Sequence, residues 1–349
     1  MNSSTTHRSA RGRVVVYGAY GHTGRFVVAE LLRRGLEPVL SGRNADRLAD
    51  LAPAHPGLEV RPAPDARALG RAVAGAAAVV NAAGPFLDTA GPVAAAAVAA
   101  GAHYLDVTAE QPAAAATLRE HAASAAAAGV AVLPAMAFYG GLADLLATAA
   151  AGGDPVQEVT VAVGLDGWRP TEGTRVTGER NTAPRLLVEG GRLVRLEEVA
   201  PAGRDWDFPG PLGRQATVPL PFSEIVLLHR HLGADRITSY LNEGPLAELR
   251  DPATPGPEAA DATGRSAQRF AVDVRVRVEG TERRATASGQ DIYAVTAPLL
   301  AEAVVRLLDG RVRAVGALAP GEVFDAADFL SALAPDPLAL TLPAAVPVP

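Results

Sequence analysis

The stretch from Arg13 to Gly24, RVVVYGAYGHTG, constrains the fold of this chain more than any other. It opens with three valines, which are typical of a strand buried on both faces. Gly18, Gly21 and Gly24 follow, and an amphipathic helical pattern then runs to Gly35. A strand, a tight turn and a helix N-terminus together bind an anion, most often the pyrophosphate of a dinucleotide. The alternative is a ligand-free turn, because the spacing is G-x-x-G-x-x-G and not the commoner G-x-G-x-x-G.

The end of the next predicted strand, Glu37–Ser41, indicates which dinucleotide binds. An NAD site places a carboxylate here for the ribose 2′-hydroxyl, and this strand end has none. Ser41 offers a hydroxyl and Arg43 a forked cation, which suit a 2′-phosphate, although Arg43 could also be a solvated surface residue. We therefore predict NADP as the cofactor. The residues expected around its phosphates are Gly18, Ala19, Tyr20, Gly21, His22, Thr23, Gly24, Ser41, Arg43 and Asn44.

Strand and helix patterns alternate as far as about residue 150, which predicts a doubly wound parallel sheet of α/β class. A strand at 77–80 leads into the loop Asn81-Ala82-Ala83-Gly84-Pro85-Phe86. Ligands bind beyond the carboxyl ends of such strands. We expect the nicotinamide half of the cofactor to contact Asn81, Ala83, Gly84, Pro85 and Phe86. An ordinary Gly-Pro turn with Phe86 in the core explains the same residues equally well.

Titratable side chains gather at the end of the next strand, 103–106, and at a later crossover. Tyr104, Asp106 and Glu110 belong to the first group, and Tyr139 precedes two glycines. We consider these four residues as candidates for proton transfer or substrate contact. The alternatives are that Asp106 caps the following helix and that Tyr139 only packs.

The pattern changes after Gly152-Gly153-Asp154-Pro155. Segments 158–165, 186–188, 192–196, 270–278 and 283–288 alternate with period two, which predicts an antiparallel sheet. Loops are expected at 167–181, 201–221 and 251–264, with helices at 223–232 and 294–308, the latter packing on the first domain. The loop at 167–181 carries arginines and a tryptophan that could close over the cofactor and bind a carboxylate. The predicted domains are 11–140, 141–290 and 291–349.

Composition excludes several kinds of chemistry. The 349 residues are 48% hydrophobic, enough for two domains, and the net charge of −6 argues against nucleic-acid binding. The chain has no cysteine and no lysine, so it has neither a thiolate nucleophile nor a Tyr-x-x-x-Lys site.

We expect no metal site, because His229 and His231 are two residues apart and do not share a helix face. Residues 1–11 are polar and no apolar run reaches membrane-spanning length, so we expect a cytoplasmic protein.

Several segments together resemble the saccharopine dehydrogenase-like reductases. They are GAYGHTGR at 18–25, SGRN at 41–44, NAAGPF at 81–86, GAHYLDVTAE at 101–110, DIYAVTAPLLAEAV at 291–304 and GALAPGEVFDAADFL at 316–330. The resemblance extends over essentially the whole chain. It implies an NADP-binding Rossmann domain, an inserted antiparallel α+β substrate domain and a C-terminal helix that returns to the first domain.

The resemblance also implies an oxidoreductase. We expect hydride transfer between NADPH and a small molecule with a C=N bond, that is, an imine or secondary amine. An enoyl (C=C) reductase on the same scaffold and an NADP-binding sensor without activity are the alternatives. We expect neither a nucleic-acid nor a membrane partner, and an antiparallel sheet with an open face is compatible with a homodimer.

Overall fold

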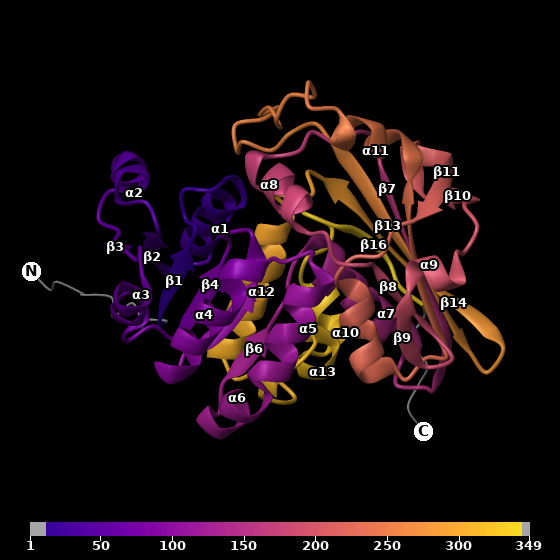
Figure 1. Ribbon diagram of the computed structural model, residues 1–349, viewed down its shortest axis with the longest axis horizontal. Coiled ribbons are helices and arrows are strands. Elements are labelled where there is room, and N and C mark those ends of the chain that lie inside the picture. Colours follow the sequence, from indigo (N-terminus) through magenta and orange to yellow (C-terminus); the bar gives the residue numbers. More distant parts are fainter. Residues whose placement is uncertain (1–11, 344–349) are drawn as a thin grey trace, which may run out of the picture.

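The computed structural model describes residues 12–343, so the polar segment 1–11 lies outside the described residues. Its first sheet is entirely parallel (Figure 1). The strand order is β15 (Gly316–Ala317), β6 (Ala131–Leu133), β5 (His103–Asp106), β4 (Ala78–Asn81), β1 (Arg13–Tyr17), β2 (Glu37–Gly42) and β3 (Val60–Pro62). The predicted doubly wound sheet is therefore confirmed, with β1 as an interior strand between β4 and β2.

The valines of β1 show why this strand is buried on both faces. Val14 and Val16 belong to one hydrophobic cluster and Val15 belongs to another, because successive side chains of a strand point to opposite faces. Helices therefore cover both sides of the sheet. The helical elements up to residue 142 are α1 (His22–Arg33), α2 (Ala45–Leu51), the 3-10 turn η1 (Ala52–Ala54), α3 (Ala66–Val73), α4 (Phe86–Ala99), α5 (Gln111–Glu120), α6 (Ala122–Ala128) and the π-helical turn η2 (Phe138–Leu142). The next helix, α7 (Ala143–Ala151), packs instead against strands 269–278 and 281–290 of the second sheet.

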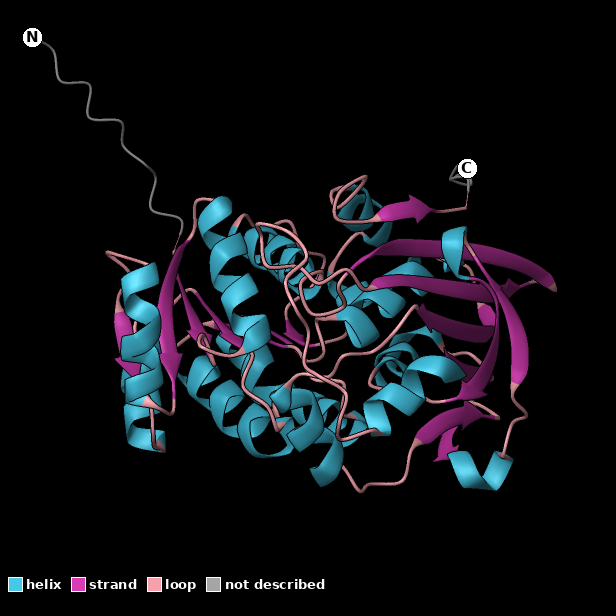
Figure 2. Cartoon of the chain, turned by 90° about the horizontal axis from the view of Figure 1, so that it is seen from above, coloured by secondary structure: helices cyan, strands magenta, loops and turns pink. Residues whose placement is uncertain are grey.

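The second sheet is mixed and mostly antiparallel, with one parallel pair between β7 and β12, and it lies at the opposite end of the molecule from β3 (Figure 2). Its main path is β10 (Arg204–Phe208), β11 (Gly213–Pro219), β12 (Arg236–Asn242), β7 (Val156–Leu165), β13 (Arg269–Val278), β14 (Thr281–Gln290) and β16 (Ala339–Thr341). Strand β8 (Leu186–Glu189) pairs with β12 and with β9 (Arg192–Arg195). Its helices are α8 (Glu172–Arg180), α9 (Leu196–Val199), the 3-10 turn η3 (Gly210–Leu212), α10 (Glu224–Leu232) and α11 (Glu243–Arg250).

Two of the expected loops contain regular secondary structure. The predicted loop 167–181 contains α8, which buries no residue and so has no apolar stripe to reveal it. The predicted loop 201–221 contains the hairpin β10–β11. Helix α4 begins at Phe86. The Glu110 carboxylate accepts a hydrogen bond from the Phe86 N–H at 2.8 Å, which stabilises the first turn of this helix.

The C-terminal segment contributes to both sheets. Helix α12 (Thr296–Leu308) packs along α1, and β15 extends the first sheet, whereas β16 pairs with β14 in the second (Figure 1). The short helices α13 (Pro320–Val323) and α14 (Ala326–Ser331) lie near α7. Among residues 12–343, none of the helices combines the length and the apolar character needed to cross a membrane.

A buried histidine–aspartate pair joins α7, α10 and α13. His231 Nε2 lies 2.7 Å from Asp144 Oδ1, and Asp144 Oδ2 accepts a hydrogen bond from the Gly321 N–H at 2.6 Å. Burial lowers the pKa of His231, but the Asp144 carboxylate outweighs burial, so the pKa is raised overall. The folded state therefore binds this proton more tightly than the unfolded chain does.

We expect the stability contributed by His231 to be complete below about pH 6.5, the ordinary histidine pKa, and to be lost as the pH rises through the raised value. The measurement is urea unfolding from pH 5.5 to 8.5 on the wild type, His231→Gln and the control His229→Gln. The stability difference between the wild type and His231→Gln should shrink as the pH rises. A difference that does not change with pH would contradict this assignment.

Candidate functional site

The glycine-rich turn forms a cradle of backbone amides between β1 and α1. Gly18 has φ +91°, and a Cβ there would lie 2.8 Å from the Ala82 carbonyl carbon. At Gly24 a Cβ would lie 2.1 Å from the Gly18 oxygen, so the turn and the helix can approach only at glycine. The N-cap residue Gly21 has no side chain to cap α1, and the first turn contains no acidic residue. The first-turn amides thus remain available to an anion, and these residues fit a dinucleotide pyrophosphate.

The structure separates the residues expected at the 2′-phosphate. Arg43 lines the cavity beside the turn, whereas Ser41 is fully buried and donates its hydroxyl hydrogen to the Arg61 carbonyl at 2.8 Å. Asn44 caps α2 by accepting a hydrogen bond from the Arg47 N–H at 2.9 Å. Neither Ser41 nor Asn44 lines the cavity, so the direct phosphate contacts expected of them are not supported.

Arg47 is a cavity residue that the sequence analysis missed. Its guanidinium carbon lies 4.8 Å from the centre of the Tyr20 ring, and both residues line the same cavity as Arg43. The first turn of a helix brings Arg47 back toward the strand end, and the four-residue spacing from Arg43 could have indicated this. Two arginines therefore stand at the position expected for a 2′-phosphate.

Replacing Arg43 with alanine is expected to weaken NADPH binding by about 1.5–3 kcal/mol, the usual contribution of a hydrogen bond to a charged group. NADH lacks the 2′-phosphate, so its affinity should hardly change. Calorimetric titration of both coenzymes with wild type and variant measures the effect, and Arg67→Ala, a substitution on the exposed surface of α3, is the control. Equal losses for the two coenzymes would remove Arg43 from the phosphate site.

The loop after β4 is shaped by Asn81. The Asn81 side chain is fully buried, accepts a hydrogen bond from the Ala83 N–H at 3.1 Å and donates to the Tyr104 hydroxyl at 3.2 Å. Asn81 is therefore behind the cavity wall, whereas Ala83, Gly84, Pro85 and Phe86 line it. Asn81 therefore stabilises the loop from behind the cavity wall. The four other loop residues remain candidates for contact with the nicotinamide.

Tyr104 and Asp106 lie beneath the site and do not line it. Both are fully buried, and the Tyr104 hydroxyl donates to Asp106 Oδ2 at 2.9 Å. Asp106 Oδ1 also accepts hydrogen bonds from the backbone N–H groups of Thr108 and Ala135. Burial raises the pKa of Asp106 to about 6, against these hydrogen bonds. The expectation that these two side chains contact substrate is therefore corrected, because their hydrogen bonds hold strands and loops together.

Glu110 and Tyr139 do line the cavity. Glu110 Oε2 accepts the Phe86 N–H, while Oε1 has no hydrogen-bond partner within residues 12–343. Burial is the main cause that raises the pKa of Glu110. The Tyr139 hydroxyl is likewise buried and unpartnered within the described part of the chain, and burial raises its pKa well above the ordinary value. These are the two candidate groups that the fold brings to the cavity.

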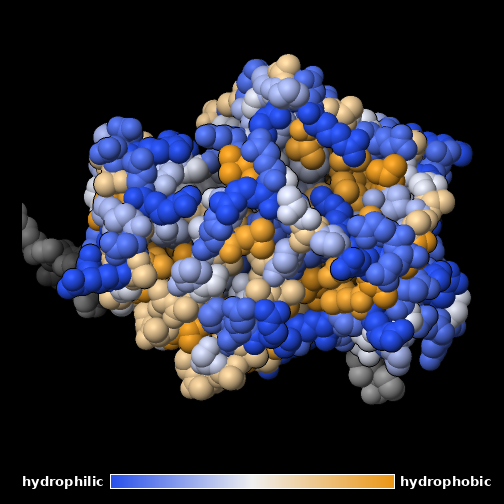
Figure 3. Space-filling model, in the orientation of Figure 1, coloured by the Kyte–Doolittle hydropathy of each residue, from blue (hydrophilic) through white to orange (hydrophobic). Residues whose placement is uncertain are grey.

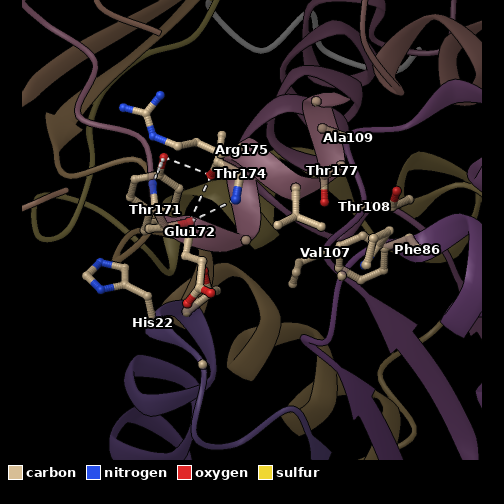
Figure 4. Close-up of a pocket in the computed structure, with 18 of the residues that line it drawn as sticks. His22, Phe86, Val107, Thr108, Ala109, Thr171, Glu172, Thr174, Arg175 and Thr177 are labelled. Atoms are coloured by element: carbon tan, nitrogen blue, oxygen red, sulfur yellow. Dashed lines mark hydrogen bonds between the residues drawn. The ribbon is translucent and has the colours of Figure 1, made fainter. Parts of the chain in front are cut away.

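The cavity has a volume of about 910 Å³ and lies between the first sheet and α8 (Figure 4). Glu172, Thr174 and Thr177 of α8 line one side, and Phe86 and Val107 lie opposite. Figure 3 shows that the molecular surface in this orientation is mostly hydrophilic, with apolar patches near the middle of the molecule.

Tyr293 holds α8 in place over the cavity. Its hydroxyl accepts a hydrogen bond from Trp168 Nε1 at 3.1 Å and lies 3.0 Å from Thr174 Oγ1. Its ring contacts the His22 ring of α1 edge to face, with centroids 5.4 Å apart. At the other end of α8, Arg180 forms a two-point ion pair with Asp88 of α4. Helix α8 is thus attached both to α1, through Tyr293, and to α4.

Fold and site together define a Rossmann-type, dinucleotide-binding protein with a second sheet domain. Residues 14–133 match the family model described as saccharopine dehydrogenase NADP binding domain. Residues 14–133 are therefore an NADP-binding domain of the saccharopine dehydrogenase type, which supports an NADP-dependent oxidoreductase. No curated protein matched the sequence.

The first of three solved structures that are similar to this chain shows the same fold. Apo histidine-tagged saccharopine dehydrogenase (L-Glu forming) from Saccharomyces cerevisiae matches with TM-score 0.64 and 14% identity, over 95% of this chain and 100% of that chain. An engineered D-amino acid dehydrogenase bound to NADP+ matches with TM-score 0.46 and 15% identity, over 89% and 93% of the two chains. Triphenylmethane reductase from Citrobacter sp., complexed with NADP(H), matches with TM-score 0.25 and 27% identity, over 27% and 37%.

Proposed function

We propose that this oxidoreductase transfers hydride between NADPH and the C=N bond of a small molecule. The observation that carries the proposal is one cavity in which the phosphate turn and the loop ending at Phe86 meet Glu110 and Tyr139. Within residues 12–343, Glu110 Oε1 and the Tyr139 hydroxyl are buried and have no hydrogen-bond partner. The similarity in fold to a saccharopine dehydrogenase, whose name describes an L-glutamate-forming reaction, supports C–N chemistry.

The chain's own residues would supply position and a proton. When bound, NADPH supplies the hydride. The amides at Gly21–Gly24 would hold the pyrophosphate, and Gly84, Pro85 and Phe86, which line the cavity, would contact the nicotinamide. Glu110 in its protonated form donates a proton to the imine nitrogen, and Tyr139 donates a hydrogen bond to the same atom. One hydride on carbon and one proton on nitrogen convert the C=N bond to a secondary amine.

The raised pKa of Glu110 makes the reduction pH-dependent. The protonated carboxyl is the active form, so we expect kcat for reduction to fall as the pH rises through that pKa. Glu110→Gln keeps an oxygen for the Phe86 N–H but cannot donate the proton, and its kcat should fall by about 100-fold. Glu120→Gln on the exposed end of α5 is the control. An unchanged pH profile in Glu110→Gln would exclude Glu110 as the proton donor.

A substrate panel tests the proposed reaction directly. NADPH consumption is followed with a cyclic imine, with aldehyde–amine and ketone–amine mixtures, and with enoyl thioesters. Turnover of the imines and the mixtures supports C=N reduction. Turnover of enoyl thioesters alone would replace it with C=C reduction, for which the aromatic wall of Tyr139, Phe222 and Trp168 offers a flat surface. NADPH binding without consumption of any of these compounds would contradict both.

We also propose that each of the three predicted segments has its own role. Segment 11–140 would bind the cofactor, 141–290 would bind substrate, and 291–349 would connect the two through Tyr293 and α12. A homodimer through the second sheet remains our prediction, and sedimentation velocity would test it.

A further inference from the structure

We propose that Arg185 is the anchor for a carboxylate on the substrate, whose planar apolar body lies against Tyr139 and Phe222. This inference rests on the proposed function, because it names the substrate class for the same cavity. Arg185 lies just before β8 and lines the cavity from the side of the second sheet. The sequence analysis did not single it out.

The backbone around Arg185 is held firmly where the two sheets meet. Its neighbour Leu186 exchanges two hydrogen bonds with the Gln111 side chain, each 2.8 Å long. The Arg185 carbonyl accepts a hydrogen bond from the Leu196 N–H at 2.8 Å. Gln111 directly follows Glu110, so these contacts tie the arginine to the strand edge that carries the proposed proton donor. Strand β8 lies close to α10, and α10 lies against α5 (Figure 1).

The Arg185 side chain is oriented but its charge is not matched by an ion pair. Within residues 12–343, its one protein hydrogen bond runs from Nη1 to the Pro221 carbonyl at 2.7 Å. The guanidinium stacks over the Phe222 ring at 5.0 Å, and no carboxylate of the described chain forms an ion pair with it. Burial lowers the pKa of Arg185, so the site disfavours an unpaired cation. A bound carboxylate would complete the remaining hydrogen bonds and offset that cost.

Glu224 is a nearby acid, but it does not neutralise Arg185 through a direct contact. Glu224 Oε1 accepts the Phe222 N–H at 2.9 Å, and Oε2 has no partner within residues 12–343. Burial raises the pKa of Glu224 to about 7, so a substantial fraction of this group is protonated at neutral pH. The other acids near α10, Asp144 and Glu322, are paired with His231 and Arg230. The cavity therefore retains a positive charge at Arg185.

The wall beside Arg185 is aromatic. The rings of Tyr139 and Phe222 are stacked with centroids 4.2 Å apart, and Trp168 lies 5.9 Å from Tyr139. The cofactor's own anions belong elsewhere, at the α1 turn and beside Arg43. A cation next to a flat apolar wall fits a substrate that combines a carboxylate with a planar or aromatic body.

Calorimetric titration of the NADPH-loaded protein with 3-phenylpropionate and with its uncharged amide, 3-phenylpropionamide, tests the anchor. The wild type should bind the acid at least about 10-fold more tightly than the amide, as expected for a charge-assisted hydrogen bond. Arg185→Met should lose this preference, Arg185→Lys should retain part of it, and Arg192→Met on the exposed strand β9 should behave as the wild type. NADPH affinity should be the same in all four proteins.

Three outcomes would overturn the proposal: no binding of the acid to the wild type, equal affinity for acid and amide, or an undiminished preference in Arg185→Met. The comparison on the wild type does not depend on a variant that folds. Failure of the C=N assay together with the expected binding pattern would reject the reaction and keep the anchor. Imine turnover together with equal acid and amide binding would reject only the anchor.

Discussion

Replacing Gly24 with alanine is expected to weaken NADPH binding by roughly 100-fold. The new Cβ would lie 2.1 Å from the Gly18 oxygen and 2.9 Å from the Gly18 carbonyl carbon. Both are backbone atoms of the turn that would hold the pyrophosphate, so relief of the clash must move the turn away from α1. Overpacking of this kind costs roughly 1–3 kcal/mol or more. If this free energy must be spent to form the turn conformation that binds NADPH, a cost of about 3 kcal/mol weakens NADPH binding roughly 100-fold.

Gly70→Ala is the matched control for Gly24→Ala. Gly70 lies within α3, and a Cβ there would meet nothing within 4 Å, so alanine should stabilise the helix slightly. NADPH titration and thermal unfolding of both variants distinguish a local change in the turn from unfolding of the whole protein. Tight NADPH binding by Gly24→Ala would show that this turn does not hold the cofactor.

Replacing Glu302 with glutamine should cost about 1.5–3 kcal/mol of unfolding free energy, because Arg34 and Arg306 each lose one of their two carboxylate partners. Glu302 of α12 pairs with Arg34 at the end of α1, and its Oε1 accepts a hydrogen bond from Arg306 Nε at 2.7 Å. Arg306 is only 2% exposed, and Asp328 of α14 pairs with its Nη1 at 2.6 Å. These ion pairs fasten the C-terminal segment to the helix that begins at the phosphate turn.

The unfolding free energy is measured in urea, with Glu282→Gln as the control. Glu282 is an exposed residue of β14 whose nearest ion pair, to Arg275, is 3.7 Å long, and such surface pairs contribute little. A similar small loss in both variants would mean that the Glu302 pairs do not hold α12 in place. We expect NADPH affinity of Glu302→Gln to fall less than its stability, because Arg34 lies at the far end of α1 from the turn.

Much of the first sheet could be predicted because its signals are local. The β1 valines, the glycine spacing and the stop at Gly35 lie within one short stretch, and the structure places β1 in the interior of a parallel sheet. Strand β5 has the predicted bounds. The hairpin β10–β11 was missed because its buried residues, Trp206 and Phe208, alternate with charged ones inside a Pro/Gly-rich stretch.

The sequence by itself determined the class of cofactor and the end of the sheet at which it binds. Steric exclusion at Gly24 and the helix N-terminus depend only on neighbours along the chain, whereas the close approach at Gly18 is to Ala82 and Ala83 in the loop after β4. Tertiary structure alone decided that Tyr104 and Asp106 lie beneath the site while Glu110 and Tyr139 line it. It also brought Arg185, Tyr293 and α8 to the cavity from distant segments. The physical reason is that side-chain exposure depends on which segments pack over a strand end, and no local pattern carries that information.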